Sequence, residues 1–286
     1  HMTTASSSAP ANSPEWVVCV LASVVAGGVP VPLDVQLGET PLRGILEGSG
    51  ARFAFADPGQ LARLGRLASG SPPRGVRLGP GEDAGGPHWR DLLAESRLTS
   101  HTPRAADTAV LFYTSGTTGP PKGVPLSHRN VVFQLDSLDG LGIIERGDRV
   151  LLPLPLHHVY PFVVGMLAPL SLRLPLVLPR SLTGPQIRRA MASGRTTAVI
   201  GVPELYSTLE AFIDAQLGSR GAAVGAGLRG LRAGSQWLRR RFGLRAGRWL
   251  LAPLHRRMGT PLRLLASGGS ALPEALAWRL QAYGWD

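Results

Sequence analysis

Apolar and polar positions alternate in blocks along the chain, beginning with an uncharged block of 18 residues at 16–33. Ser13 followed by Pro14 predicts a helix start, because a serine side chain caps free N–H groups and proline fits the first turn. We expect this helix to end at Gly27-Gly28 and a short strand to follow at 29–33. Glycine and proline interrupt the block and no basic residue precedes it, so it predicts neither a signal peptide nor a membrane-spanning helix.

Strand and helix patterns then alternate to the end of the chain. Strand patterns occupy 52–56, 108–114, 150–154, 176–178 and 196–200, and helix patterns occupy 42–49, 127–138, 183–192 and 203–217. Thr183-Gly184-Pro185-Gln186 predicts a capping box, and residues 70–89 predict a long polar loop. This alternation is typical of an α/β fold with layered, mostly parallel sheets. Residues 1–12 are predicted to be a tag remnant and a flexible lead-in.

Composition narrows the class of protein. The chain is 44% hydrophobic and 17% charged, which excludes an intrinsically disordered protein. Its single cysteine, Cys19, excludes a disulfide scaffold and a thiolate zinc site, and it is predicted to pack as a small apolar side chain in a reducing compartment. The net charge is +11, but all of the 30 basic residues except Lys122 are arginine. Such arginine usage resembles a compositional bias of the source genome, and no nucleic-acid partner is expected.

The segment 113–123, Tyr-Thr-Ser-Gly-Thr-Thr-Gly-Pro-Pro-Lys-Gly, follows a predicted strand and collects hydroxyls, glycines and the lone lysine. Glycines let backbone N–H groups approach an anion, hydroxyls add donors, and a lysine ammonium suits phosphate oxygens. It is not a Walker A loop, because Gly123 rather than serine or threonine follows Lys122 and the next residues are extended. The alternative is a solvated hairpin turn rich in glycine, proline and threonine.

This segment resembles the signature of the adenylate-forming superfamily, which includes acyl-CoA synthetases, luciferases and peptide-synthetase adenylation domains. The resemblance implies that the loop embraces the β- and γ-phosphates of ATP, that Mg²⁺ participates, and that coenzyme A is a co-substrate. It assigns cofactor binding to Thr114, Ser115, Gly116, Thr117, Thr118, Gly119 and Lys122, with Lys122 also catalytic. Thr114 or Thr117 would contact the metal.

Further segments follow the order of that superfamily. Residues 154–160 resemble the segment whose histidine borders the acyl pocket, which assigns a catalytic and substrate-binding role to His158. A structural role is the alternative for a histidine pair with apolar flanks, and no acidic neighbour of either ring is visible in the sequence. Residues 265–273 resemble the strand and turn that lie against adenine, and 201–206 resemble the segment beside the acyl tunnel. The residues implied there are Gly268, Gly269, Ser270 and Ala271 for the nucleotide, and Val202, Pro203 and Tyr206 for the substrate. An ordinary strand-to-helix turn and plain core are the alternatives for these two segments.

The resemblance covers residues 13–286 as a partial large domain, truncated at both ends. The magnesium-binding glutamate and the small C-terminal domain of the superfamily have no counterpart in this sequence. We therefore expect this chain alone to be inactive or severely impaired.

The positive charge concentrates in a helical excursion at 215–265. Between Asp214 and Glu274 the sequence has 11 arginines and no acidic residue, with tryptophan, phenylalanine and leucine interleaved. A nucleic-acid patch, a solvated basic face and an amphipathic surface for anionic lipid are the three interpretations. Because long-chain acyl-CoA synthetases carry a similar excursion, the third is favoured, with peripheral membrane contact through residues 229–257.

We expect the full-length protein to activate a fatty acid, of long-chain type, to an acyl-adenylate and then to acyl-CoA. Its predicted location is the cytoplasm, with peripheral contact at the inner membrane face. The alternatives are adenylation of an aryl or amino acid, and a non-catalytic fragment that associates with nucleotide or lipid.

Overall fold

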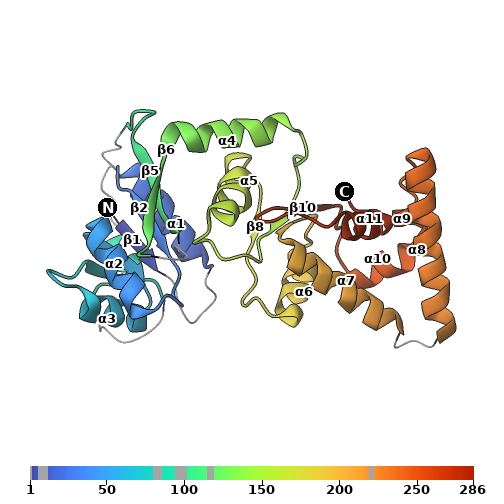
Figure 1. Ribbon diagram of the computed structural model, residues 1–286, viewed down its shortest axis with the longest axis horizontal. Helices are drawn as coiled ribbons and strands as arrows, with labels where there is room; N and C mark the ends of the chain where they lie inside the picture. The colour runs from blue at the N-terminus through green and yellow to red at the C-terminus, as the bar shows by residue number, and fades with distance from the viewer. Residues whose placement is uncertain (1, 6–11, 80–85, 94–101, 115–118, 219–221) are drawn as a thin grey trace. The chain divides into compact units, whose positions relative to one another are not determined.

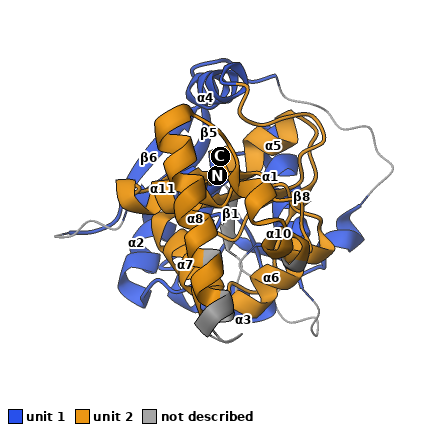
Figure 2. Cartoon of the chain, turned by 90° about the vertical axis from the view of Figure 1, so that its right-hand side faces the viewer, with its two compact units in different colours: residues 1–141, 155–163 blue, residues 142–154, 164–286 orange. Residues whose placement is uncertain are grey.

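The computed structural model describes residues 2–5, 12–79, 86–93, 102–114, 119–218 and 222–286. The chain divides into two compact units (Figure 2). Unit 1 comprises residues 1–141 and 155–163, and unit 2 comprises residues 142–154 and 164–286. A bilayer-spanning segment would need a long apolar helix, and the described part of the chain contains none.

Unit 1 is built on a parallel sheet of four strands in the order β2-β1-β3-β4. Figure 1 labels β1 and β2 of this sheet. These strands are β1 (Met2–Ala5), β2 (Pro30–Leu33), β3 (Phe53–Ala56) and β4 (Arg74–Arg77). Helices α2 (Glu39–Ser49) and α3 (Pro58–Leu67) share one apolar core with β2 and β3. That arrangement confirms the predicted parallel α/β fold for this part of the chain.

Helix α1 (Pro14–Val25) begins as predicted. The Ser13 hydroxyl oxygen accepts the Trp16 N–H at 3.2 Å, and Pro14 occupies the first turn. Cys19 is buried on this helix, and burial, with a smaller contribution from Glu15, raises the pKa of its thiol to about 11. The thiol is therefore protonated and packs as a small apolar group, as the sequence predicts.

Two predictions for the N-terminal region are wrong, and one helix was missed. Residues 2–5 are not a flexible lead-in, because β1 pairs through its main chain with β2 on one side and β3 on the other. The predicted loop at 70–89 contains β4, and a helix that the sequence did not indicate, α3, follows Asp57, whose carboxylate accepts the Gln60 N–H at 3.0 Å. Strands of four residues are too short to show a period, and main-chain pairing requires no particular side chain.

An antiparallel hairpin completes unit 1. It consists of β5 (Thr108–Thr114) and β6 (Lys122–Ser127), and helix α4 (His128–Gly140) follows directly. The Ser127 cap was predicted, and Asn130 completes a capping box with it. A short 3₁₀ helix, η1 (Trp89–Leu92), lies before the hairpin in the sequence.

Unit 2 contains a second parallel sheet, in the order β10-β9-β7-β8. Its strands are β7 (Val150–Leu151), β8 (Leu176–Val177), β9 (Ala198–Gly201) and β10 (Leu264–Ser267). The π-helical segment η2 (Pro161–Leu167) passes between the units in sequence and continues into α5 (Ala168–Ser171). The remaining helices are α6 (Gly184–Ser193), α7 (Pro203–Gly218), α8 (Ala222–Phe242), α9 (Gly247–Leu250), α10 (Ala252–Met258) and α11 (Glu274–Ala282).

The predicted helical excursion at 215–265 corresponds to the end of α7 and to α8, α9 and α10. The predicted capping box at the start of α6 is wrong. The Thr183 side chain makes no hydrogen bond to the helix, and its hydroxyl lies 3.1 Å from that of Ser181. The Thr183 hydroxyl therefore pairs with the Ser181 hydroxyl and does not cap the main-chain N–H groups of α6.

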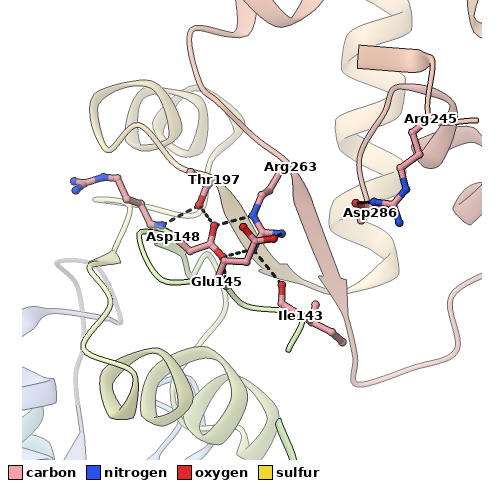
Figure 3. A network of polar contacts seen from close by, with 8 residues as sticks. Ile143, Glu145, Asp148, Thr197, Arg245, Arg263 and Asp286 are labelled. Atoms are coloured by element: carbon pink, nitrogen blue, oxygen red, sulfur yellow. Dashed lines mark hydrogen bonds and ion pairs between the residues drawn. The ribbon is translucent and has the colours of Figure 1, made fainter. Parts of the chain in front are cut away.

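A polar network ties three strands of unit 2 together (Figure 3). Asp148, just before β7, accepts hydrogen bonds from the Arg263 guanidinium, from Thr197 Oγ1 at 2.6 Å and from the Glu145 N–H at 2.7 Å. Arg263 also contacts the Glu145 carboxylate at 3.2 Å. Burial alone would raise the pKa of Asp148, but these hydrogen bonds hold it below its usual value. The ionised carboxylate fixes the entries to β7, β9 and β10 in one place.

Candidate functional site

The β5–β6 hairpin places a hydroxyl and an ammonium side by side. Thr114 and Lys122 are the paired residues at the loop end of the hairpin, and both side chains are exposed. Paired residues of antiparallel strands project to the same face of the hairpin, with Cβ atoms about 5 Å apart. The threonine therefore precedes the joining loop and the lysine follows it, and both side chains lie on one face of the hairpin. A hydroxyl and an ammonium placed in this way suit an anion with several oxygens.

Packing of the neighbouring pair, Tyr113 and Gly123, explains how the loop end of the hairpin is held. The Tyr113 ring packs against the core of unit 1, and burial raises the pKa of its hydroxyl. A Cβ on Gly123 would lie 3.3 Å from Leu111 and 3.5 Å from the Tyr113 ring. The absence of a side chain on Gly123 therefore gives the Tyr113 ring room to lie over β6. The residues on either side of the loop are thus anchored while Thr114 and Lys122 face solvent.

The four central loop residues that the sequence assigns to phosphate binding, Ser115, Gly116, Thr117 and Thr118, lie outside the described residues. Gly119 is described and exposed, and a Cβ placed on it would meet nothing within 4 Å. The open space beside Gly119 is consistent with a ligand approaching the main chain there.

The histidine segment lies in the same unit as the hairpin. The ring of Phe162 packs edge-on against Phe112 of β5 at 5.3 Å and against Trp16 of α1 at 6.2 Å. Because Phe112 and Thr114 are two residues apart on β5, they project to the same face of that strand. The segment that carries His157 and His158 is therefore anchored on the face of the hairpin that also carries Thr114.

His158, the predicted catalytic histidine, is exposed, whereas its neighbour His157 is largely buried. The two rings lie 4.2 Å apart. Burial and, to a lesser degree, His158 lower the pKa of His157 to about 4, and Asp34 offsets this only in part. The buried ring is consequently neutral near neutral pH, and the exposed ring is the one available to a ligand.

The fold supplies an acidic neighbour that is not visible in the sequence. Asp34 follows β2, and its Oδ2 lies 3.8 Å from His157 Nε2. Asn12, which precedes α1, is also part of this arrangement: it is buried, and its side-chain oxygen accepts the Leu156 N–H at 3.0 Å. Sequence reasoning missed both residues. The available signal was their position, since each is a polar residue directly beside a buried apolar element.

In unit 2, the predicted adenine and acyl segments lie side by side. Ser267 of β10 pairs with Gly201 of β9, and the Gly268 N–H donates to the Gly201 carbonyl at 3.2 Å. Gly269 has a φ of +81°, and a Cβ on it would lie 3.6 Å from Val202. This positive φ favours glycine and turns the chain so that Gly269, Ser270 and Ala271 are exposed. The two segments thus lie next to each other at the carboxyl ends of β9 and β10.

Tyr206 belongs to the core at this edge. Its side chain is buried, and its hydroxyl contacts the carbonyls of Val199 at 3.0 Å and Ala266 at 2.6 Å. Pro203 is buried as well, and Val202 is half-buried. The geometry thus gives Tyr206 the role of a brace between β9 and β10, while its predicted substrate contact stays a prediction.

The predicted contact with Mg²⁺ stays a prediction. They contain no group of three or more histidine, cysteine, aspartate and glutamate side chains that could hold a metal. Thr114 offers one neutral hydroxyl, and Thr117 lies outside the described residues. Mg²⁺ is held mainly by carboxylates and by the phosphates of a bound nucleotide, so such a site needs few protein ligands.

The sequence from residue 9 to residue 285 matches the AMP-binding enzyme family. A long-chain-fatty-acid–CoA ligase of Mycobacterium bovis, FadD15, is 33% identical over 167 residues, covering 54% of this chain and 27% of the ligase. The mitochondrial malonate–CoA ligase ACSF3 of Mus musculus is 31% identical over 206 residues, covering 71% of this chain and 35% of that enzyme. The chain thus spans about a third of the length of these relatives.

Among solved structures, a malonyl-CoA ligase in a ternary product complex with methylmalonyl-CoA and AMP superimposes with a TM-score of 0.64. The two sequences are 25% identical, and the match covers 99% of this chain and 49% of the ligase. The α/β architecture predicted from the sequence is therefore that of the large domain of adenylate-forming enzymes. The hairpin with its lone lysine, the histidine segment and the glycine turn occur in a chain that belongs to the AMP-binding enzyme family.

Proposed function

We propose that this chain is the nucleotide-receiving part of an ATP-dependent acyl-CoA ligase. The observation that carries the proposal is the pairing of exposed Thr114 with exposed Lys122 at the end of the β5–β6 hairpin. That pairing fits the phosphate-binding role that the family signature implies for this loop.

In this proposal the Lys122 ammonium and the loop N–H groups neutralise the β- and γ-phosphates of ATP. The carboxylate of the acid attacks the α-phosphorus, the bond to the β-phosphate oxygen breaks, and pyrophosphate leaves. Charge builds on the departing phosphates in that step, so a fixed cation beside them lowers the barrier. The thiolate of coenzyme A then attacks the acyl carbon and releases AMP.

The remaining site residues divide by unit. Exposed His158 would border the acyl group, held in place by the buried His157 next to it. The turn of Gly268, Gly269, Ser270 and Ala271 would lie against adenine, and Val202 and Pro203 would line the acyl path. Val202 is half-buried and lies close to Gly269. This supports the arrangement, because the carboxyl ends of β9 and β10 then offer both the adenine surface and the acyl surface.

The proposed substrate is a long-chain fatty acid. The arginine-rich excursion and the similarity to FadD15 support it, whereas the similarity to ACSF3 favours a short dicarboxylate. As part of the same proposal, the protein is cytoplasmic, with peripheral contact at the inner membrane face through residues 229–257.

ATP–pyrophosphate exchange over a panel of acids tests this proposal. The panel holds palmitate, malonate, an aryl acid and an amino acid, and it is run on this chain and on a longer chain that continues past residue 286. Exchange with palmitate above the other acids supports the proposal. Exchange with an aryl or amino acid alone would overturn the long-chain substrate, and nucleotide binding without any exchange on the longer chain would favour a non-catalytic role.

A further inference from the structure

Helix α4 of unit 1 (green in Figure 1) has apolar side chains on two sides. The helix contacts β5 and β6, yet none of its residues is buried. Val131, Leu135 and Leu138 are half-buried and lie on one side of it. Phe133 lies on the opposite side and is 72% exposed, and Val132 on the flank is 51% exposed. The packing of α4 on the hairpin therefore leaves a valine and an aromatic ring in water.

Two opposite charges flank this apolar pair. Arg129 lies one turn before Phe133, and Asp136 lies one turn after Val132. At about 100° per residue, all four side chains lie within an arc of about 100°. Arg129 and Asp136 are exposed, and neither has an ion-pair partner among the residues that the structure describes. We call Arg129, Val132, Phe133 and Asp136 the α4 stripe.

The two charges cannot neutralise each other within one helix. Seven residues correspond to about 10.5 Å along the helix axis, which is too far for an ion pair. Arg129 and Asp136 are, however, equally far in sequence from the midpoint between Val132 and Phe133. Read in either direction, the α4 stripe therefore consists of a charge, two apolar residues and the opposite charge.

Such a stripe is complementary to itself. In a two-fold interface, residue i of one copy contacts residue j of the other, and j contacts i. When a second α4 is laid antiparallel across the first with its midpoint opposite, Arg129 faces Asp136 of the second copy. Asp136 then faces the second Arg129, and Val132 faces the second Phe133. Every side chain of the α4 stripe thus meets a group of matching character.

The mixed charge of the α4 stripe disfavours other occupants. An anionic lipid surface or a nucleic acid would meet Asp136, and an acidic peptide would do the same. A basic peptide would instead meet Arg129. A second copy supplies the opposite charge at both ends, so it is the occupant that the charges fit.

We propose that the α4 stripe is the contact of a symmetric dimer of this chain, in which two α4 helices pack antiparallel. One helix from each copy makes a small interface, so the dimer should be weak, with a dissociation constant of about 100 µM. The inference is independent of ligase activity, because association is measured without ATP or an acid.

The test is sedimentation equilibrium of the purified 286-residue chain, from about 10 µM to about 300 µM. We expect the average mass to rise from that of a monomer towards that of a dimer over this range. Phe133→Ser should weaken association at least about tenfold, because both copies lose the ring. Arg129→Glu and Asp136→Arg should each weaken it about tenfold, because each places like charges opposite one another twice.

A mixture of the two charge variants is the sharper measurement. In a mixed pair of Arg129→Glu and Asp136→Arg chains, both charged contacts again join opposite signs. The mixture should therefore associate about as tightly as the unaltered chain, although each variant alone does not. A general loss of folding would not be repaired by mixing.

Matched control variants make the same types of change elsewhere. Arg66→Glu reverses an exposed charge on α3, and Leu182→Ser removes an exposed apolar side chain before α6, and both should associate like the unaltered chain. Circular dichroism and thermal unfolding verify that every variant is folded. The proposal is overturned if the chain stays monomeric throughout the range, if Phe133→Ser associates as the controls do, or if the mixture associates no more tightly than its two components.

Discussion

Lys122 of the hairpin and Arg263 beside β10 each carry one positive charge, yet their surroundings differ completely. Lys122 is exposed and has no ion-pair partner among the described residues, and its neighbour across the hairpin is a neutral hydroxyl. Arg263 is only 22% exposed and contacts both Asp148 and Glu145. Arg232 and Arg239 resemble Arg263 in being paired with carboxylates.

The difference separates two uses of charge within one chain. A paired, desolvated guanidinium is part of the fold, because removing it strands the carboxylate that it neutralises. An exposed, unpaired ammonium contributes little to folding but remains available to a ligand. Changes at the paired groups should therefore alter stability, and changes at the hairpin should alter binding only.

The largest stability effect is expected at the Asp148 network. Arg263→Ala leaves the carboxylate of Asp148, which is 3% exposed, without its main donor, so unfolding should become easier by about 3 kcal/mol. Urea denaturation measures this. Arg256→Ala, at an exposed arginine of the same unit, is the control and should change the free energy by less than about 0.5 kcal/mol. Equal losses of unfolding free energy for Arg263→Ala and Arg256→Ala would contradict the distinction between paired and exposed cations.

An intermediate effect is expected for the buried histidine. The pKa of His157 is lowered to about 4 from an ordinary value of 6.5, so the folded chain binds its proton less readily than the unfolded chain. Stability is therefore full above the unfolded pKa and falls as the pH drops toward the folded one, by about 2 kcal/mol at about pH 5.

His157→Phe should remove that part of the pH dependence, which urea unfolding near pH 7.5 and near pH 5 measures for both proteins. The comparison isolates the contribution of His157 from that of the groups that the two proteins share. If the substituted chain keeps the same loss of stability on acidification, the buried ring does not titrate as described.

A smaller effect is expected at Tyr206, the brace between β9 and β10. Tyr206→Phe keeps the ring but removes the hydroxyl that contacts the Val199 and Ala266 carbonyls, at a cost of about 1 kcal/mol. Thermal unfolding detects it. A change in substrate preference with unaltered stability would instead show that Tyr206 acts at the acyl path, as the sequence predicts.

Local signals made much of the fold predictable. The serine caps before α1 and α4 were predictable because the residue type, the spacing and the hydrogen bond are all local. The strand before the loop at 115–121 and the extended residues after Lys122 were likewise predictable, because β-branched and aromatic residues cluster in β5 and the glycines mark its end.

Features that depend on distant partners were not predictable. Strand β1 is stabilised by main-chain pairing with β2 and β3, and nothing in its own four residues shows this. The approach of Asp34 to His157 joins residues 123 positions apart, and the pairing of Arg263 with Asp148 joins residues 115 apart. Composition counted the arginines of α8 but could not show which of them face carboxylates.

The central claim is that Lys122 binds nucleotide phosphate and has no part in holding the fold. Calorimetric titration of this chain with a non-hydrolysable ATP analogue tests it directly, with Lys122→Ala compared against Arg129→Ala, an exposed cation on α4. We predict that Lys122→Ala weakens binding about 10- to 100-fold while its unfolding free energy stays within about 0.5 kcal/mol, and that Arg129→Ala changes neither. Equal affinity of the Lys122→Ala and unaltered chains would contradict the account.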